Sequence, residues 1–124
     1  MNKTNSLRKI IKNNIDPIVK SYYRKSDPKI DFPYAVFDFE NIDLGDIFRD
    51  DSILVVDVWG KGNDTSEIEK IADRIESLFN AANLPSEDSL PTFYRISRKP
   101  LDDEDKTLIH RQLKFQIQNY YIGG

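Results

Sequence analysis

Two kinds of hydrophobic spacing divide the chain into helical and extended segments. Near the start of the chain, apolar residues recur every three or four positions, which predicts an amphipathic helix. These residues are Leu7, Ile10, Ile11, Ile15, Ile18, Val19 and Tyr22. Asp16 and Pro17 interrupt the pattern. Because proline is best tolerated in a first helical turn and aspartate is a good N-cap, we expect a break near Asp16 and a second short helix to about Tyr23.

The clearest helix is expected from residue 66 to about residue 80. Its apolar positions form a single stripe, made of Ile68, Ile71, Ala72, Ile75, Leu78 and Phe79. Ser66 and Glu69 have the spacing of a capping box, in which each side chain satisfies a backbone amide of the first turn. This pair is therefore predicted to mark the start of the helix.

Four segments have the apolar–polar alternation or the apolar content of strands. They are PYAVFDFE, SILVVDVWG, TFYRISRK and HRQLKFQIQNYYI. The last alternates most cleanly, so one face should carry Leu113, Phe115, Ile117 and Tyr121 and the other Gln112, Lys114, Gln116 and Gln118. The acidic stretch NIDLGDIFRDDS connects the first two strands and would suit a hairpin, whereas LDDEDK reads as a polar turn.

The element order α-β-β-α-β-β predicts an α+β fold with a mostly antiparallel sheet and helices packed on one face. The 124 residues suit a single domain over 1–124. Within it, residues 1–23 are expected to form a helical segment on the sheet, and residues 123–124 to fray. The second face of the sheet, with its glutamines and Asp57, must meet water or a partner.

Asp57 interrupts the most apolar strand and raises the question of chemistry. Leu54, Val56 and Val58 share the core face, whereas Asp57 shares the other with Trp59. Asp57 and Asp38 could lie on adjacent strands and hold a magnesium ion, as in a metal-dependent nuclease. The second strand lacks the lysine two residues after the acid that such sites use. The favoured interpretation is an acid on the wet face beside Lys or Arg.

Composition removes most other chemistry. The chain has no cysteine and a single histidine, His110, which excludes thiolate catalysis and leaves most zinc sites and nucleophilic triads without ligands. His110 is interpreted as a surface or packing residue. WGKGND lacks the rest of either phosphate-loop signature and reads as a strand-to-helix turn. We therefore predict no catalytic residue, no metal and no cofactor.

Nothing in the sequence indicates membrane insertion or export. The first residues lack the apolar core of a signal peptide, and no apolar run approaches the ~18 residues of a membrane-spanning helix. A soluble protein of the cytoplasm is the expectation.

Charge is divided unevenly along a chain whose net charge is −3. Residues 1–30 carry eight Lys/Arg against two Asp, a net charge of +6, whereas residues 31–110 carry eight against nineteen acids, a net charge of −11. This division suggests contact between neighbouring copies or a weak approach to nucleic acid. A solvated helix face is the favoured interpretation of the basic segment, because aromatic residues do not interleave with its cations before Tyr22 and Tyr23.

The chain ends in Gly123-Gly124 after a strand, which leaves a ubiquitin-like modifier as an alternative function. A frayed terminus explains the same two residues.

The ordered set of segments resembles the tail terminator, or tail completion, proteins of long-tailed bacteriophages, also described as minor capsid or head–tail joining proteins. The resemblance runs from about Leu7 to Ile122. It rests on an N-terminal helix, FPYAVFDF, ILVVDVWG, SEIEKIADRIESLFN and LDDEDKTLIHRQLKFQIQNYY, in this order.

The resemblance implies a structural role in virion assembly and no enzymatic activity. Proteins of this family form a ring, commonly a hexamer, on the head-proximal end of the tail tube, where they stop tube growth and mediate head–tail joining. The implied partners are further copies of the chain, the tail tube protein, a head completion or connector protein, and DNA that passes transiently through the lumen. The implied location is the tail–head junction of the virion, and the host cytoplasm during assembly.

A head-to-tail ring needs two different patches on each subunit, and aromatic residues are enriched at such contacts. The expected interface residues are Asp43, Asp46, Asp50, Asp51, Trp59, Lys61, Tyr94, Arg95, Arg98 and Arg111, with Tyr120 and Tyr121 as further aromatic anchors.

Overall fold

The chain folds into two helices and one mixed, mostly antiparallel sheet, as the predicted α+β class requires. The structure is a computed structural model that describes residues 3–25, 31–43, 49–63, 65–85 and 89–121. The elements are α1 (Lys3–Ile15), β1 (Ser21–Tyr23), β2 (Tyr34–Asp43), β3 (Arg49–Lys61), α2 (Ser66–Phe79), β4 (Ala82–Asn83), β5 (Ser89–Leu101) and β6 (Leu108–Tyr121).

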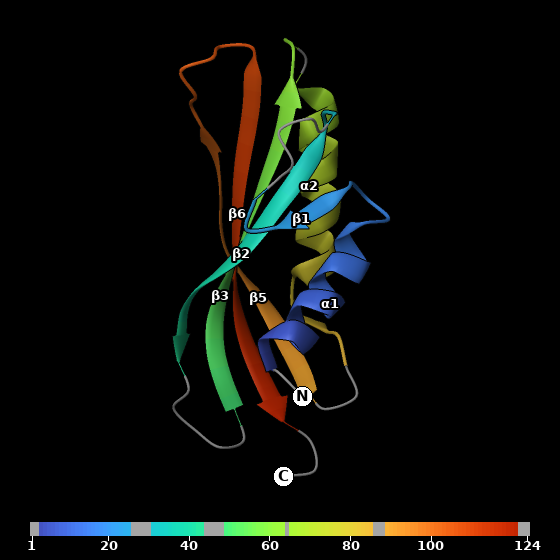
Figure 1. The fold of residues 1–124 in the computed structure, drawn as a ribbon, viewed down its shortest axis with the longest axis vertical. Helices are drawn as coiled ribbons and strands as arrows, with labels where there is room; N and C mark the ends of the chain where they lie inside the picture. The colour runs from blue at the N-terminus through green and yellow to red at the C-terminus, as the bar shows by residue number, and fades with distance from the viewer. Residues whose placement is uncertain (1–2, 26–30, 44–48, 64, 86–88, 122–124) are drawn as a thin grey trace.

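The strands lie in the order β1-β2-β3-β6-β5-β4. β1 is parallel to β2, and every other neighbouring pair is antiparallel. The four predicted strands are the four long ones, and they make two hairpins whose second strands, β3 and β6, pair in the middle of the sheet (Figure 1). The acidic connection is indeed part of a hairpin, since β2 runs to Asp43 and β3 begins at Arg49.

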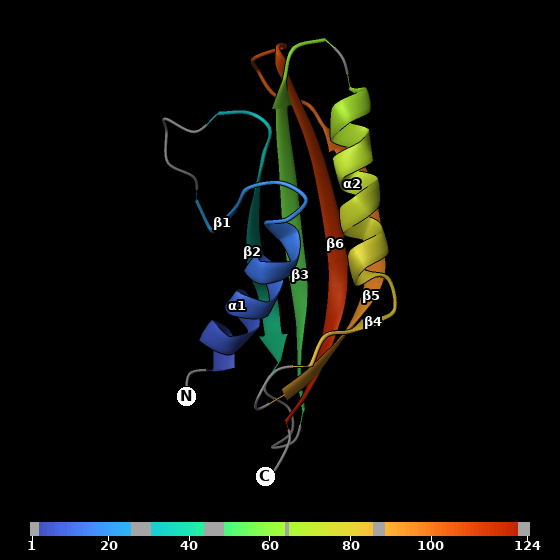
Figure 2. The ribbon, with the colours of Figure 1, turned by 90° about the vertical axis from the view of Figure 1, so that its right-hand side faces the viewer.

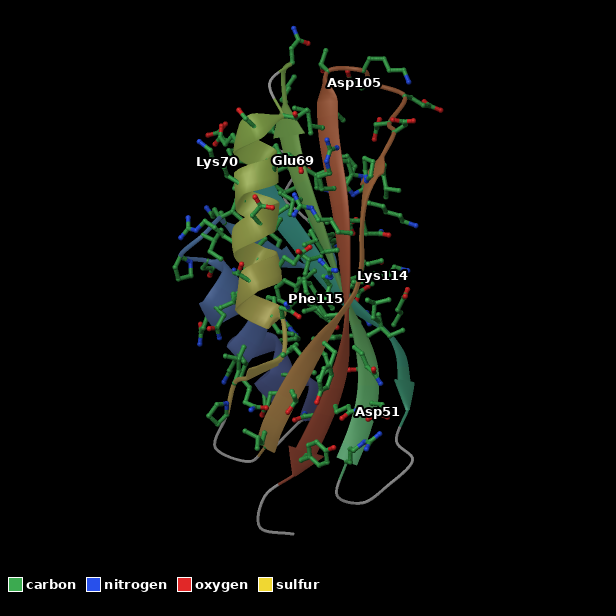
Figure 3. All side chains as sticks on the ribbon, turned by 180° about the vertical axis from the view of Figure 1, so that it is seen from behind. Asp51, Glu69, Lys70, Asp105, Lys114 and Phe115 are labelled. Carbon is green, nitrogen blue, oxygen red and sulfur yellow. The ribbon has the colours of Figure 1, made fainter. Side chains whose placement is uncertain are left out.

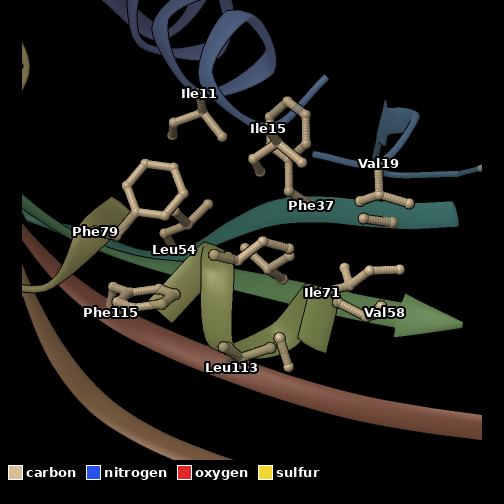
Figure 4. Packing of buried hydrophobic residues seen from close by; sticks show 14 of the residues in the cluster. Ile11, Ile15, Val19, Phe37, Leu54, Val58, Ile71, Phe79, Leu113 and Phe115 are labelled. Atoms are coloured by element: carbon tan, nitrogen blue, oxygen red, sulfur yellow. The ribbon is translucent and has the colours of Figure 1, made fainter. Parts of the chain in front are cut away.

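Both helices pack on one face of the sheet, and the core lies between the two layers (Figure 2). Side chains from α1, α2 and the central strands meet there, including the fully buried Ile11, Phe37, Phe79, Leu113 and Phe115 (Figure 4). The ring of Phe79 lies 4.9 Å from that of Phe93 and 5.4 Å from that of Phe115, measured between centroids. This aromatic contact joins the C-terminal end of α2 to β5 and β6.

Gly60 allows α2 to approach the end of β3. A Cβ atom at this position would overlap the side chain of Ile68, which is buried in the first turns of α2. Gly62 follows with φ of +119°, a conformation that L side chains rarely adopt. Trp59–Lys61 of the WGKGND segment thus belong to β3, and Gly62 and Asn63 begin the predicted connection to α2.

The prediction of a second short helix to about Tyr23 is wrong. α1 ends at Ile15, and Ser21–Tyr23 form the edge strand β1. The side chain of Asp16 accepts hydrogen bonds from the backbone amide and the hydroxyl of Ser21 at 3.0 and 2.6 Å, and Lys12 Nζ donates to the carbonyl of Ser21 at 2.6 Å. β2 supplies the remaining partners, since Arg24 N donates to Phe37 O at 2.8 Å. Pairing with a distant strand thus overrides the local helical spacing.

α2 begins at Ser66, as predicted, but Ser66 is not its N-cap residue. The N-cap of α2 is Thr65, and its side chain makes no capping hydrogen bond. Glu69 points instead towards two arginines of the sheet, Arg98 and Arg111. Two ion pairs with cationic partners outweigh one hydrogen bond to a backbone amide at an exposed helix start.

Candidate functional site

The face of the sheet opposite the helices, called the open face below, carries Asp51, Trp59, Lys61 and Tyr94 of the predicted contact residues, whereas Asp50, Arg95, Arg98 and Arg111 lie on the helix side. On β3 the exposure alternates strictly, so that every residue on the helix side is buried and every residue on the open face is half-buried up to Trp59. Lys114 and Phe115 illustrate the division, because Phe115 points towards α2 whereas Lys114 points away from it (Figure 3). The open face is formed by Val36, Asp38, Ile53, Val55, Asp57, Trp59, Tyr94, His110, Gln112, Lys114, Gln116, Gln118 and Tyr120.

Asp57 is held in a hydrogen-bonded group near one end of this face. Its Oδ1 lies 2.6 Å from His110 Nε2 and accepts a hydrogen bond from Gln112 Nε2 at 3.1 Å. The ring of His110 stacks on Trp59 at 3.7 Å between centroids, with 19° between the planes. His110 is therefore a packing residue, as predicted. The side chain beside the Asp57 carboxylate is this histidine rather than the expected Lys or Arg.

Asp38 does not join Asp57. Its Oδ1 accepts from the backbone amide of Phe39 at 2.7 Å and faces Arg24 Nε at 3.4 Å. Among the described residues there is no group of three or more His, Cys, Asp or Glu side chains that could hold a metal ion. The two carboxylates thus have separate partners, and their arrangement gives no support to the nuclease hypothesis.

The three predicted arginines connect the sheet to α2. Arg95 Nη1 lies 2.9 Å from Glu76 Oε1, and Arg98 lies 2.6 Å from both Asp73 Oδ1 and Glu69 Oε2. Arg111 binds the other oxygen of Glu69 through Nε. These side chains leave from the helix side of β5 and β6, so their first role is internal.

Glu69 is the centre of this arginine group, and its pKa is lowered (its place on α2 is seen in Figure 3). Burial alone would raise the pKa of the Glu69 carboxyl, but hydrogen bonds from Arg111 and Arg98 and their positive charges outweigh it. Arg98 lies deeper than Glu69, with 21% of its side chain exposed against 39%. The group therefore combines partly buried charges with hydrogen bonds to both carboxylate oxygens of Glu69.

The predicted acidic residues do not form one exposed patch within the described part of the chain. Asp50 is buried on the helix side of β3, while Asp51 is bound by Arg49 at 2.8 and 2.7 Å. Asp46 lies outside the described residues, as does the side chain of Asp43.

Tyr94, Arg95 and Lys61 are predicted contact residues that stay exposed. Tyr94 is 41% exposed on the open face, and Tyr120 on the same face is 40% exposed. Lys61 is exposed at the end of β3. Tyr121 ends β6, and its side chain lies outside the described residues, as do Gly123 and Gly124.

The sequence interpretation missed one cluster of residues. Tyr22 and Tyr23 were assigned to a helix, yet as part of β1 they lie among cationic side chains from α1 and from their own strand. The available signal was the segment KSYYRK itself, in which two aromatic residues stand between basic ones.

Comparison with solved structures gives a likeness over nearly the whole chain. The chain is similar in structure to a chain of the virion of a native gene transfer agent particle, with a TM-score of 0.60 and 13% sequence identity. The match covers 94% of this chain and 90% of that one, so at this identity it defines a shared fold over nearly the whole length. No protein-family model and no curated protein matches the chain. No helix among the described residues is long and apolar enough to cross a membrane.

Proposed function

We propose that this chain is a structural component of a phage-like virion that forms a ring on the head-proximal end of a tail tube. In this role it terminates tube growth and joins the tail to the head. Its partners are further copies of itself, commonly five others in a hexameric ring, the tube protein and a head completion or connector protein. It performs no chemical reaction.

The observation that carries the proposal is the fold. The similar chain belongs to a virion, and the likeness extends over 94% of this chain without a large unmatched part on either side. The segments that resemble tail terminator proteins cover the same length of the sequence. Fold likeness alone is a weak guide to function, so the ordered segments and the fold support the proposal together.

The open face carries exposed aromatic side chains that suit protein contacts. Tyr94 and Tyr120 expose 41% and 40% of their surface on a face that no helix covers in the described part of the chain. Aromatic side chains of this kind are enriched at interfaces, where their burial contributes much of the binding energy. Lys61 and the half-buried Trp59 extend this surface towards the α2 end of β3. We therefore place the contact with the tube or with the neighbouring copy on the open face.

The test is to polymerise the tail tube protein of the same virion, with and without the purified protein. Electron microscopy should show shorter tubes with an extra ring at one end, and mass photometry of the ring fraction should give a multiple of 14.4 kDa. Tubes of unchanged length with bare ends, together with a strictly monomeric protein, would contradict the proposal.

A paired variant locates the contact. Tyr94→Ser with Tyr120→Ser should lower the free energy of unfolding by about 1 kcal/mol per site, because the two residues are only 41% and 40% exposed and each loses part of its packing. The same variant should lose binding to tube ends or to other copies. Lys70→Ser on the exposed side of α2 is the control, and it should keep both activities (Figure 3).

A further inference from the structure

Cationic side chains gather around the two tyrosines of β1, the strand at one edge of the sheet. The guanidinium carbon of Arg8 lies 4.2 Å from the centroid of the Tyr23 ring, and that of Arg24 lies 5.3 Å from the same ring. Tyr22 and Tyr23 are successive residues of a strand, so their side chains leave on opposite sides of it. The cations around Tyr23 therefore cover one side of the edge.

The other tyrosine has its own pair of cations. Lys12 Nζ lies 5.6 Å and Lys20 Nζ lies 5.8 Å from the centroid of the Tyr22 ring. Positive charge thus lies on both sides of β1. If Tyr22 and Tyr23 belonged to a helix, as the sequence predicted, the cations would not be divided between two sides of a strand. At these distances the ammonium and guanidinium groups make cation–π contacts with the tyrosine rings.

Aromatic rings continue the surface away from β1. Tyr22 meets Tyr34 edge-on at 6.4 Å, and Tyr34 packs against Phe32 at 5.3 Å, between centroids. Phe32 is 37% exposed, and Lys61 Nζ lies 6.0 Å from its ring. We call the whole surface the basic–aromatic edge; it consists of Arg8, Lys12, Lys20, Tyr22, Tyr23, Arg24, Phe32, Tyr34 and Lys61.

Acids lie near at least three of these five cations: Asp16 at Lys12, Asp38 at Arg24 and Asp105 near Lys61. Asp16 contacts Lys12 at 3.3 Å but also accepts two hydrogen bonds from Ser21, and Asp38 lies 3.4 Å from Arg24. The Arg24 side chain remains 68% exposed beside Asp38. Residues 1–30, which supply Arg8, Lys12, Lys20 and Arg24, have a net charge of +6, so positive charge exceeds negative charge along this edge.

We propose that the basic–aromatic edge binds the phosphodiester backbone of nucleic acid without regard to sequence. Exposed lysines and arginines supply the sequence-independent part of such binding, and aromatic rings beside them offer faces on which unpaired bases stack. Addition of a further β-strand along β1 is the less favoured alternative, because the backbone carbonyl and amide of Ser21 are already hydrogen-bonded to Lys12 and Asp16. This inference does not depend on the proposed ring or on tube termination.

The test measures binding of fluorescent 20-nucleotide probes, one double-stranded and one single-stranded, by anisotropy over a range of salt concentrations. The test variant is Lys20→Glu with Arg24→Glu. The matched control is Lys70→Glu with Lys99→Glu, which makes the same change in net charge with two exposed lysines on α2 and β5, away from β1 in the strand order.

The wild type and the control should bind with affinity that falls as salt rises. The test variant should bind roughly tenfold or more weakly at low salt, and the slope of log affinity against log salt should decrease by about 2, one for each lost phosphate contact. If the single-stranded probe binds more strongly than the double-stranded one, and Tyr22→Ala weakens that binding, the tyrosine rings stack on unpaired bases. Circular dichroism and a thermal melt of each variant confirm that the fold is kept.

Two results would overturn the inference. One is absence of binding by the wild type at low salt, and the other is an equal loss in the test and control variants, which would reflect net charge alone. If the test variant binds the probes normally but no longer associates with other copies, the edge is a contact for an acidic surface of the neighbouring copy and the nucleic-acid assignment is wrong.

Discussion

The two faces of the sheet are built from the same strands but have different roles. On the helix side, Leu54, Val56, Leu113 and Phe115 are completely buried. On the open face, their immediate neighbours are only half-buried, and polar groups such as Gln116 alternate with the apolar Ile53 and Val55. The first face has an internal partner in α1 and α2, whereas the second has none in the described part of the chain (Figure 2).

The difference separates folding from contact. Burial of apolar surface against the helices stabilises the domain, at about 25 cal/mol for each Å² removed from water. The open face keeps enough polar groups to remain in water and enough aromatic surface to bind a partner. Substitutions on the helix side should therefore change stability first, and substitutions on the open face should change assembly first.

The largest effect is expected from Phe115→Ala, which removes a fully buried ring that contacts Phe79. We expect a loss of about 3–5 kcal/mol in the free energy of unfolding, because a large cavity remains. The matched control is Gln116→Ala, the next residue of β6 on the open face, which should change it by no more than about 0.5 kcal/mol. Urea denaturation measures both. Similar values for the two variants would mean that the faces do not differ in their energetic roles.

Gly60→Ala is the second prediction and tests how closely α2 approaches β3. The added methyl group would overlap Ile68, so we expect a loss of about 1–3 kcal/mol. Ile68→Val removes one of the overlapping atoms, and the double variant should be less destabilised than the sum of the two single variants. A strictly additive double-mutant cycle would argue against the contact.

A smaller effect is expected from Glu69→Gln, which breaks the ion pairs of α2 with Arg98 and Arg111. Because Glu69 is more than a third exposed, solvent screening limits the loss to about 1 kcal/mol. The pKa of the folded Glu69 is lowered, so its stabilisation is present above the ordinary glutamate pKa and is lost as pH falls through the lowered value.

The pH dependence provides the check on this prediction. Thermal melts of the wild type and the Gln variant should differ at neutral pH and converge as the solution becomes acidic. A difference that stays constant down to strongly acidic pH would show that packing, and not the ionised carboxylate, accounts for the loss.

The long elements of the fold could be predicted from local spacing. The stripe from Ile68 to Phe79 and the alternation of β6 depend only on neighbouring residues, so both were readable without the fold. β1 was not, because Ile18, Val19 and Tyr22 fit a helical stripe and the strand exists only by pairing with β2. The residues that pair with β1, Ala35 to Phe37, lie fourteen residues further along the chain.

Residue type was enough to nominate the candidate contact residues, but it did not predict which side chains they bind within the fold. Tyr94 was expected at a contact surface, and it is exposed on the open face. Arg95, Arg98 and Arg111 were expected to meet other proteins, yet each binds a carboxylate of α2 at a distance in sequence that no local pattern encodes. Asp57 likewise finds His110, 53 residues away.

The sequence by itself determined which residues alternate, where the α2 stripe lies and how the charge is divided along the chain, because each of these is a property of neighbouring positions. The tertiary structure alone decided the strand order, the pairing of Glu69 with two arginines and the gathering of cations around Tyr22 and Tyr23. Those arrangements depend on long-range pairing, in which the free energy of contacts between distant segments outweighs local preference.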